Sequence, residues 1–155
     1  MGTPPIPNRD NDEIRAMGYV ALYSGYLEEA IGDCFVRLKC FDTQRTDKTW
    51  QVSARIESCA RAIGTLPCTE DLGAILADLE QAASVLRDRN TVIHSPLYGQ
   101  IESPNVRHAP RPADERRFVT ADQVYDLAEE LRAFSEAFAA YAAQLPRFID
   151  AALNE

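Results

Sequence analysis

The chain has 155 residues, a formal net charge of −8 at pH 7 and a hydrophobic fraction of 46%. This length fits one compact domain and leaves little room for a second. Its balance of hydrophobic and charged residues is that of a folded protein rather than a disordered one. No apolar run approaches the roughly 20 residues that span a bilayer, so we expect no membrane contact. The acidic balance also excludes a protein that coats duplex DNA.

The N-terminus and the cysteines indicate the compartment. Residues 1–10 contain three prolines and no apolar core, so they do not resemble a secretory signal. The four cysteines form no C-x-x-C pair and lie far from both histidines in the sequence. We therefore expect reduced thiols that act as small hydrophobic side chains, not a zinc site or a disulfide framework. These features predict a cytoplasmic protein without a metal or another cofactor.

A polar, proline-rich arm precedes the first predicted helix. We expect residues 1–10 to be flexible and residues 11–153 to form a single helical domain. The first helix is predicted from Asn11 or Asp12 to about Phe41, because acidic residues at its start suit the positive end of the helix dipole. Its predicted apolar side consists of Ile14, Met17, Ala21, Leu27, Ile31, Cys34, Phe35 and Leu38.

Three glycines recur at seven-residue spacing in this helix: Gly18, Gly25 and Gly32. They fall on nearly the same stripe, although each costs roughly 1 kcal/mol relative to alanine inside a helix. This spacing suggests that another backbone approaches closely. The approaching backbone belongs either to another part of the same chain or to a second copy.

Two more helices are predicted before a long irregular segment. The second runs from Asp47 to about Leu66, and Pro67 follows its end. The third begins after Thr69, a good N-cap, and ends at His94. Its predicted apolar stripe consists of Leu72, Leu76, Leu79, Ala83, Leu86, Asn90 and Ile93.

The last helix has the clearest start in the chain. Thr120 and Gln123 have the spacing of a capping box, and the apolar stripe continues to Pro146, which is expected to end or kink the helix. Residues 98–118, before this helix, read as a long irregular segment or a short hairpin. The predicted fold is therefore all-α, an antiparallel four-helix bundle with this segment before the last helix.

A polar cluster interrupts the apolar stripe at the end of the third predicted helix. Asn90 occupies a position where Leu or Ile is expected, and His94 lies about 40° around the helix axis from it. Arg87 and Arg89 border the same face. One interpretation is that Asn90 and His94 form hydrogen bonds that specify helix register. The other is a phosphate-handling site, because arginine offers a planar fork for phosphate oxygens and histidine exchanges protons near neutral pH.

The segment Arg89-Asn90-x-x-x-His94 resembles the R-x4–6-H motif of HEPN domains, in which a polar residue follows the arginine. HEPN domains are all-helical and occur in toxin–antitoxin systems, phage-defence proteins and RNA-targeting CRISPR effectors. The motif covers six residues, and the helical pattern covers about residues 11–150. The position of the motif at the end of a long helix agrees with the family.

The resemblance implies a metal-independent endoribonuclease. In the family, two motifs meet across a homodimer interface, and the 2′-hydroxyl of the RNA attacks the adjacent phosphate to leave a 2′,3′-cyclic phosphate. Carried over, His94 acts as general base or acid, Arg89 stabilises the charged phosphorane, and Asn90 positions the histidine or the phosphate. Proton transfer works best with one base and one acid, so a symmetric dimer supplies the second histidine.

Further residues are candidates for binding RNA or for supporting the motif. The candidate substrate-binding residues are Arg87, Ser95, Tyr98, Arg107 and His108. Many HEPN domains also have an acidic residue on an earlier helix near the motif, and Glu28, Glu29 and Glu57 are candidates. Family members controlled by a nucleotidyltransferase antitoxin often carry tyrosine two positions after the histidine. Here that position is Pro96, which argues against this route of control.

The resemblance also implies a setting, a toxin–antitoxin or phage-defence system with an antitoxin or defence protein as a possible partner. Two alternatives remain open at this stage. The chain could be a HEPN-like module that has lost cleavage and binds a nucleotide, RNA or a partner protein. It could also be a purely structural helical dimer.

Overall fold

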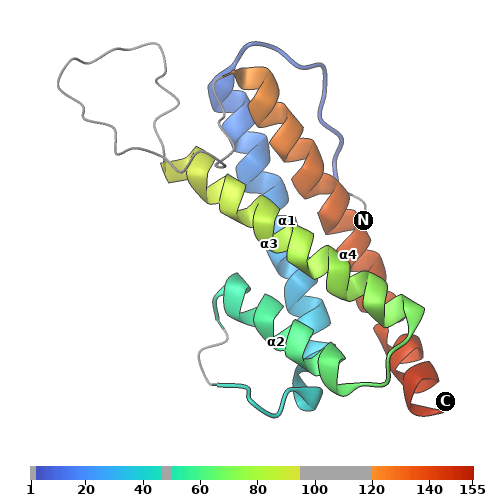
Figure 1. Cartoon of the computed structure of the whole chain (residues 1–155). Coiled ribbons are helices and arrows are strands. Elements are labelled where there is room, and N and C mark those ends of the chain that lie inside the picture. The colour runs from blue at the N-terminus through green and yellow to red at the C-terminus, as the bar shows by residue number, and fades with distance from the viewer. Residues whose placement is uncertain (1–2, 47–49, 95–119) are drawn as a thin grey trace.

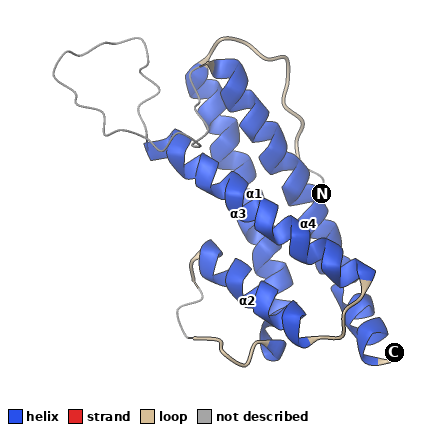
Figure 2. Cartoon of the chain, in the orientation of Figure 1, coloured by secondary structure: helices blue, strands red, loops and turns tan. Residues whose placement is uncertain are grey.

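The computed structural model describes residues 3–46, 50–94 and 120–155, and this part of the chain is helical without a strand (Figure 2). The helices are α1 (Glu13–Leu38), the short 3-10 helix η1 (Lys39–Phe41), α2 (Val52–Thr65), α3 (Glu70–His94) and α4 (Ala121–Leu153). The predicted all-α class is confirmed. The predicted segment 98–118 lies outside the described residues.

The long helices α1 and α4 lie side by side and run in the same direction, and α3 crosses them in the opposite direction (Figure 1). Helix α2 packs against α1 and α3. The structure is thus a helical bundle in which α3 is antiparallel to both of its long neighbours. None of the described helices has the length and the hydropathy that a membrane span requires.

The core lies where α1 meets α4 and where α3 covers them. Burying a large apolar side chain contributes about 1.5–3 kcal/mol, so this contact region holds the bundle together. Its largest fully buried side chains are Tyr23, Leu27, Ile31, Leu38, Leu72, Ile75, Leu79, Tyr125, Leu127, Leu131, Phe138 and Leu145.

The capping contacts at three helix starts involve the residues that the sequence predicts for them. The Asp12 carboxylate accepts a hydrogen bond from the Arg15 backbone N–H at 3.1 Å, and the Thr69 hydroxyl accepts one from the Leu72 N–H at 3.2 Å. Thr120 and Gln123 form the predicted capping box, with both reciprocal bonds present. These caps satisfy backbone donors that a helix start leaves without partners.

Two predicted boundaries differ from the structure. Helix α2 begins at Val52 rather than at Asp47, because Gln51 has extended backbone and acts as the N-cap. Helix α4 continues through Pro146 to Leu153, although proline removes one backbone donor. Leu145 and residues 148–149 are buried on either side of the proline, and this packing holds the last turns in helical form.

The buried side of α1 is only partly the predicted one. Leu27, Ile31, Cys34, Phe35 and Leu38 are buried as predicted, but Ile14 is 83% exposed and Ala21 is also exposed. In the first half of the helix, the buried stripe is Ala16, Val20, Tyr23 and Ser24. The predicted stripe failed there because Ile14 and Ala21 share a face with the glycines rather than with the core.

The glycine stripe of α1 faces outward. Apart from the adjoining backbone of α1, a Cβ atom added at Gly18 or Gly25 would meet no atom of the described residues within 4 Å, whereas one at Gly32 would lie 3.1 Å from Arg55 Nη1. Packing within the chain therefore explains Gly32 and is the wrong explanation for the other two. Contact with a second copy remains the prediction for Gly18 and Gly25.

Residues 3–12 of the N-terminal arm lie along α4 (Figure 1). The flexibility of residues 1–10 stays a prediction.

The cysteines fit the expectation in part. Cys34 and Cys59 are buried, as expected for small hydrophobic side chains, and burial raises the pKa of both thiols to about 12. Cys40 and Cys68 are exposed and do not fit that expectation.

A buried carboxylate fastens the chain after η1 to α2. The side chain of Asp42 is 1% exposed and accepts hydrogen bonds from Ser58 Oγ at 2.7 Å and from the Arg61 guanidinium at 2.9 and 3.0 Å. The bonds from Arg61, followed by the bond from Ser58, lower the pKa of Asp42 to about 2. Its ionised form is therefore favoured by folding, since the usual pKa is 3.8.

We predict that Asp42→Asn lowers the free energy of unfolding by about 2 kcal/mol at pH 7. The folded pKa is below the unfolded value, so this stability is present above about pH 4 and is lost as the pH falls toward 2. Urea unfolding of both proteins at several pH values measures the difference. A difference that stays constant between pH 4 and pH 2 would show that the carboxylate charge is not responsible.

Candidate functional site

Arg89, rather than Asn90, lies on the buried face of α3. Leu72, Leu79 and Leu86 of the predicted stripe are buried, but the stripe is wrong at Asn90, which is exposed, and at Leu76, which is 39% exposed. Arg89 comes three residues before Val92, which is 1% exposed, and residues three or four apart share a helix face. The buried face of α3 consists of Leu72, Ile75, Leu79, Ala82, Val85, Leu86 and Val92.

The guanidinium of Arg89 forms an ion pair with α1. Arg89 Nη1 donates to Glu28 Oε1 at 2.6 Å, and the two side chains are 16% and 39% exposed. A charge-assisted hydrogen bond of this length is among the stronger polar contacts in proteins. It joins residues 61 positions apart and fixes the end of α3 on the middle of α1.

This ion pair leaves part of the guanidinium without a partner. Arg89 Nε is buried and has no acceptor among the described residues. An unpartnered buried donor costs about 1–3 kcal/mol, so a second acceptor at this guanidinium would stabilise it. The Glu28 carboxylate thus satisfies only part of the hydrogen-bonding capacity of this guanidinium.

The structure selects one of the three acidic candidates. Glu28 pairs with Arg89, whereas Glu29 and Glu57 are exposed and form no ion pair with it. Among the three candidates, Glu28 is thus the one that the described structure pairs with Arg89. Adjacent helical residues such as Glu28 and Glu29 point about 100° apart, so at most one of them faces α3. The sequence alone does not show which one, because that depends on how α1 is turned toward α3.

The histidine position lies on another side of α3. His94 is the last residue of the helix, five residues after Arg89, which corresponds to about 140° around the axis and about 7.5 Å along it. Its side chain lies outside the described part of the chain. Asn90 precedes it by one turn and is exposed on that side of the helix.

The candidate substrate-binding residues are only partly placed. Arg87 is exposed on α3, one turn before Thr91, whose hydroxyl donates to the Arg87 carbonyl at 3.3 Å. The structure brings neither Arg87 nor Asn90 to the Arg89–Glu28 pair. The remaining candidates, Ser95, Tyr98, Arg107 and His108, fall outside the described residues.

The guanidinium of a second arginine, Arg55 of α2, lies against α1 one turn after Glu28. The Arg55 guanidinium of α2 lies 6.0 Å from the centre of the Phe35 ring and beside Gly32, which follows Glu28 by four residues. The absence of a side chain at Gly32 allows this approach. The glycine spacing was the only sequence signal for this contact, and it did not identify the partner.

Comparisons with protein-family models, with curated proteins and with solved structures found no match. Within the described ranges, no three His, Cys, Asp or Glu side chains group closely enough to hold a metal ion. The function proposed below therefore rests on the contacts of the described residues.

We predict that Glu28→Ala lowers the free energy of unfolding by about 1–2 kcal/mol, because it leaves a mostly buried guanidinium without its carboxylate. The matched variant Glu29→Ala removes an exposed carboxylate from the next position and should change it by less than about 0.5 kcal/mol. Urea unfolding of the two variants measures both values. Equal effects would show that the ion pair does not fasten α3 to α1.

Proposed function

We propose that this chain is a metal-independent endoribonuclease of the HEPN type that acts as a homodimer in the cytoplasm. The observation that carries the proposal is the ion pair between Arg89 of the motif and Glu28 of α1. It gives the arginine the acidic partner on an earlier helix that the resemblance implies, and it holds the guanidinium near the end of α3, where the motif lies.

The proposed reaction needs one base, one acid and a cation. A histidine takes the proton from the 2′-hydroxyl of the RNA, and the 2′-oxygen forms a bond to the adjacent phosphorus. The bond from phosphorus to the 5′-oxygen breaks, and a second histidine donates a proton to that oxygen. Arg89 stabilises the negative charge on the phosphorane through its planar fork. His94 has the base and acid roles, and Asn90 holds a substrate oxygen nearby.

A dimer explains how these groups would meet. The positions of Arg89 and His94 lie about 140° apart around the axis of one helix, so one protomer does not place the two residues on the same face of α3. A two-fold axis near the motif would bring the histidine of one protomer toward the arginine of its partner. Each chain would then contribute to both sites.

The open face of α1 supports this assembly. Gly18 and Gly25 have no neighbour within 4 Å of where a Cβ would lie, and Leu22 beside them is 40% exposed. Glu28 follows Gly25 by three residues and therefore lies at the edge of the same face. A second copy packed on these glycines would place two Arg89–Glu28 pairs close to the interface.

We further propose the setting that the resemblance implies, a toxin–antitoxin or phage-defence system in which a partner protein restrains or triggers cleavage. The Arg89–Glu28 pair supports regulation of this kind. Because the carboxylate competes with phosphate for the guanidinium, a partner that moves α1 relative to α3 would change the activity.

We predict that the purified protein cleaves mixed RNA in the presence of EDTA and leaves 2′,3′-cyclic phosphate ends. His94→Ala should reduce cleavage at least 100-fold, since general acid–base catalysis contributes about 10²–10⁴-fold. The control variant Arg147→Ala changes an exposed arginine near the end of α4 and should retain full activity. Electrophoresis of end-labelled RNA and mass spectrometry of the product ends measure the result.

Mixing wild-type and His94→Ala protomers tests the shared site. After unfolding together and refolding at equal concentrations, the mixture should keep about a quarter of the wild-type activity rather than about half, because a dimer with one protomer of each kind has a single His94. Binding of RNA without cleavage by the wild type would favour the inactive HEPN-like module instead. Neither cleavage nor binding, with a large loss of stability in His94→Ala, would favour the structural helical dimer.

A further inference from the structure

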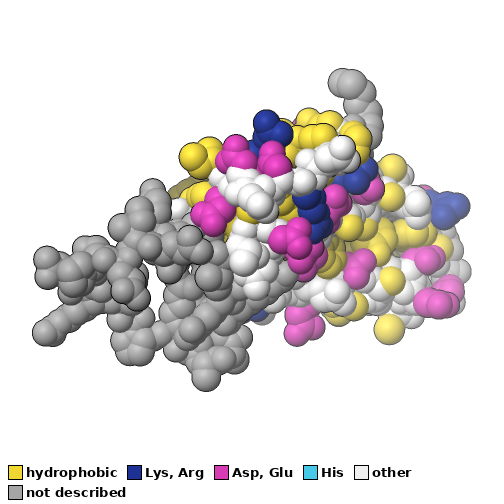
Figure 3. Space-filling view, turned by 90° about the horizontal axis from the view of Figure 1, so that it is seen from above, with side chains coloured by type: hydrophobic (Ala, Val, Ile, Leu, Met, Phe, Trp, Pro, Cys, Tyr) yellow, Lys and Arg dark blue, Asp and Glu magenta, His cyan; other side chains and the backbone are white. Residues whose placement is uncertain are grey.

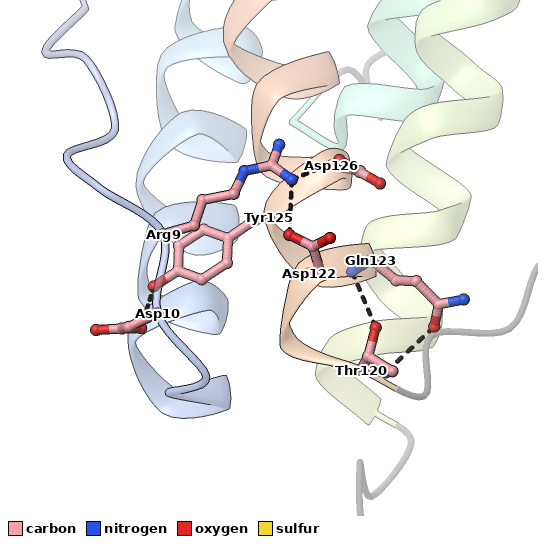
Figure 4. A network of polar contacts seen from close by, with 7 residues as sticks. All are labelled: Arg9, Asp10, Thr120, Asp122, Gln123, Tyr125 and Asp126. Carbon is pink, nitrogen blue, oxygen red and sulfur yellow. Dashed lines mark hydrogen bonds and ion pairs between the residues drawn. The ribbon is translucent and has the colours of Figure 1, made fainter.

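The N-terminal arm lies along the side of α4 away from α3 (Figures 1 and 4). Its first described residue, Thr3, donates a hydrogen bond to Glu136 Oε1 at 2.7 Å, and the Pro4 carbonyl accepts one from the Tyr23 hydroxyl. Ile6 packs against the core. The arm is therefore held over the junction of α1 and α4 along most of its length.

Tyrosines from both helices form the surface beneath the arm. The rings of Tyr19 and Tyr23 stack with centres 6.0 Å apart, and the Tyr125 ring lies 6.2 Å from Tyr19. The Tyr125 hydroxyl donates to Asp10 Oδ1 at 2.8 Å (Figure 4). Aromatic rings with hydroxyl donors are the features with which proteins hold extended proline-rich segments.

Two carboxylates hold the one arginine of the arm. Arg9 Nη1 donates to Asp122 Oδ1 at 2.9 Å and to Asp126 Oδ1 at 2.8 Å, and its guanidinium lies 5.8 Å from the Tyr125 ring centre (Figure 4). Seen from above, acidic side chains lie among hydrophobic and basic ones over the described surface (Figure 3). The surface is thus suited to a positive charge on an apolar segment.

The contacts of the arm depend on the types of chemical group that it offers rather than on one particular sequence. They use a backbone carbonyl at Pro4, an apolar side chain at Ile6 and a guanidinium at Arg9, and each of these could come from another chain. A proline-rich segment is already extended in solution, so binding orders it at a small entropic cost. Any such segment with an arginine at the same spacing would fit.

The ion pairs of the arm lie at the surface and contribute little to holding it. Arg9 is 36% exposed and its partners Asp122 and Asp126 are 76% and 53% exposed, and exposed ion pairs contribute about 0–1 kcal/mol. Beside Thr3, Arg132 shares the Glu136 carboxylate, yet its buried Nε has no acceptor in the described part of the chain. The arm thus leaves at least one donor that a better ligand could use.

We propose that the surface formed by Tyr23, Tyr125, Asp122 and Asp126 is a docking site for an extended, proline-rich, arginine-bearing segment of a partner protein. In this inference, residues 3–10 occupy the site in cis and compete with the partner. A segment attached directly to α1 has an effective concentration of about a millimolar, so the partner must bind more tightly than the arm or release it. The site lies apart from the Arg89–Glu28 pair and does not depend on the proposed nuclease activity.

The test uses full-length protein and a fluorescein-labelled peptide with the sequence of residues 3–11. Arg9→Glu weakens the arm without changing the docking surface, so this variant should bind the peptide at least tenfold more tightly than the wild type does. Arg147→Glu makes the same charge change far along α4 and should bind like the wild type. Fluorescence anisotropy measures the dissociation constants, and circular dichroism checks that each variant is folded.

Exchanging the charges of the peptide and of the docking surface tests whether the two carboxylates recognise the arginine. A peptide with glutamate in place of its arginine should bind Arg9→Glu at least tenfold more weakly than the original peptide does. The double variant Asp122→Lys, Asp126→Lys should reverse this preference, because the carboxylates then become cations. Equal binding of both peptides by Arg9→Glu and by the double variant, or no gain over the wild type, would overturn the proposal.

Discussion

A mostly buried arginine near the end of α3 is the constraint on which the account of this protein depends. Burial removes water from the Arg89 guanidinium, so the charge requires the Glu28 carboxylate, and this contact fixes where α3 crosses α1. An apolar residue at this position would hold the helices together without the cost of desolvating a charge. The presence of a charge at a core-facing position is therefore better explained by a functional site than by stability.

Local features of the fold could be predicted from the sequence, and the phase of the buried faces could not. The capping residues Asp12, Thr69 and Thr120 identify helix starts because each bond spans only a few residues. In α3, however, alternative stripes of similar hydropathy exist, one through Leu76 and Asn90 and one through Ile75 and Arg89. Contact with α1 and α4 decides between them, and that contact is not encoded locally.

Long-range pairing explains the remaining differences. The sequence indicated that an acidic residue supports the motif, but only the packing of α3 on α1 selects Glu28 over its neighbour Glu29. The arm has the composition of a mobile segment, yet contacts with α4, more than 100 residues away, hold it in place. Both cases depend on side chains brought together by the folded core. They also place two distinct surfaces on one bundle, the Arg89 region on α3 and the arm surface on the far side of α4.

We propose that a second copy packs on the open glycine face of α1 and completes a ribonuclease site there. Gly25→Leu and Gly73→Leu form a matched pair of variants for this proposal, because a Cβ at either position meets no side chain of the described residues within 4 Å. Light scattering and RNA cleavage are measured on both. Gly25→Leu should be monomeric and inactive, while Gly73→Leu should remain dimeric and active. A Gly25→Leu protein that dimerises and cleaves RNA like Gly73→Leu would contradict the account.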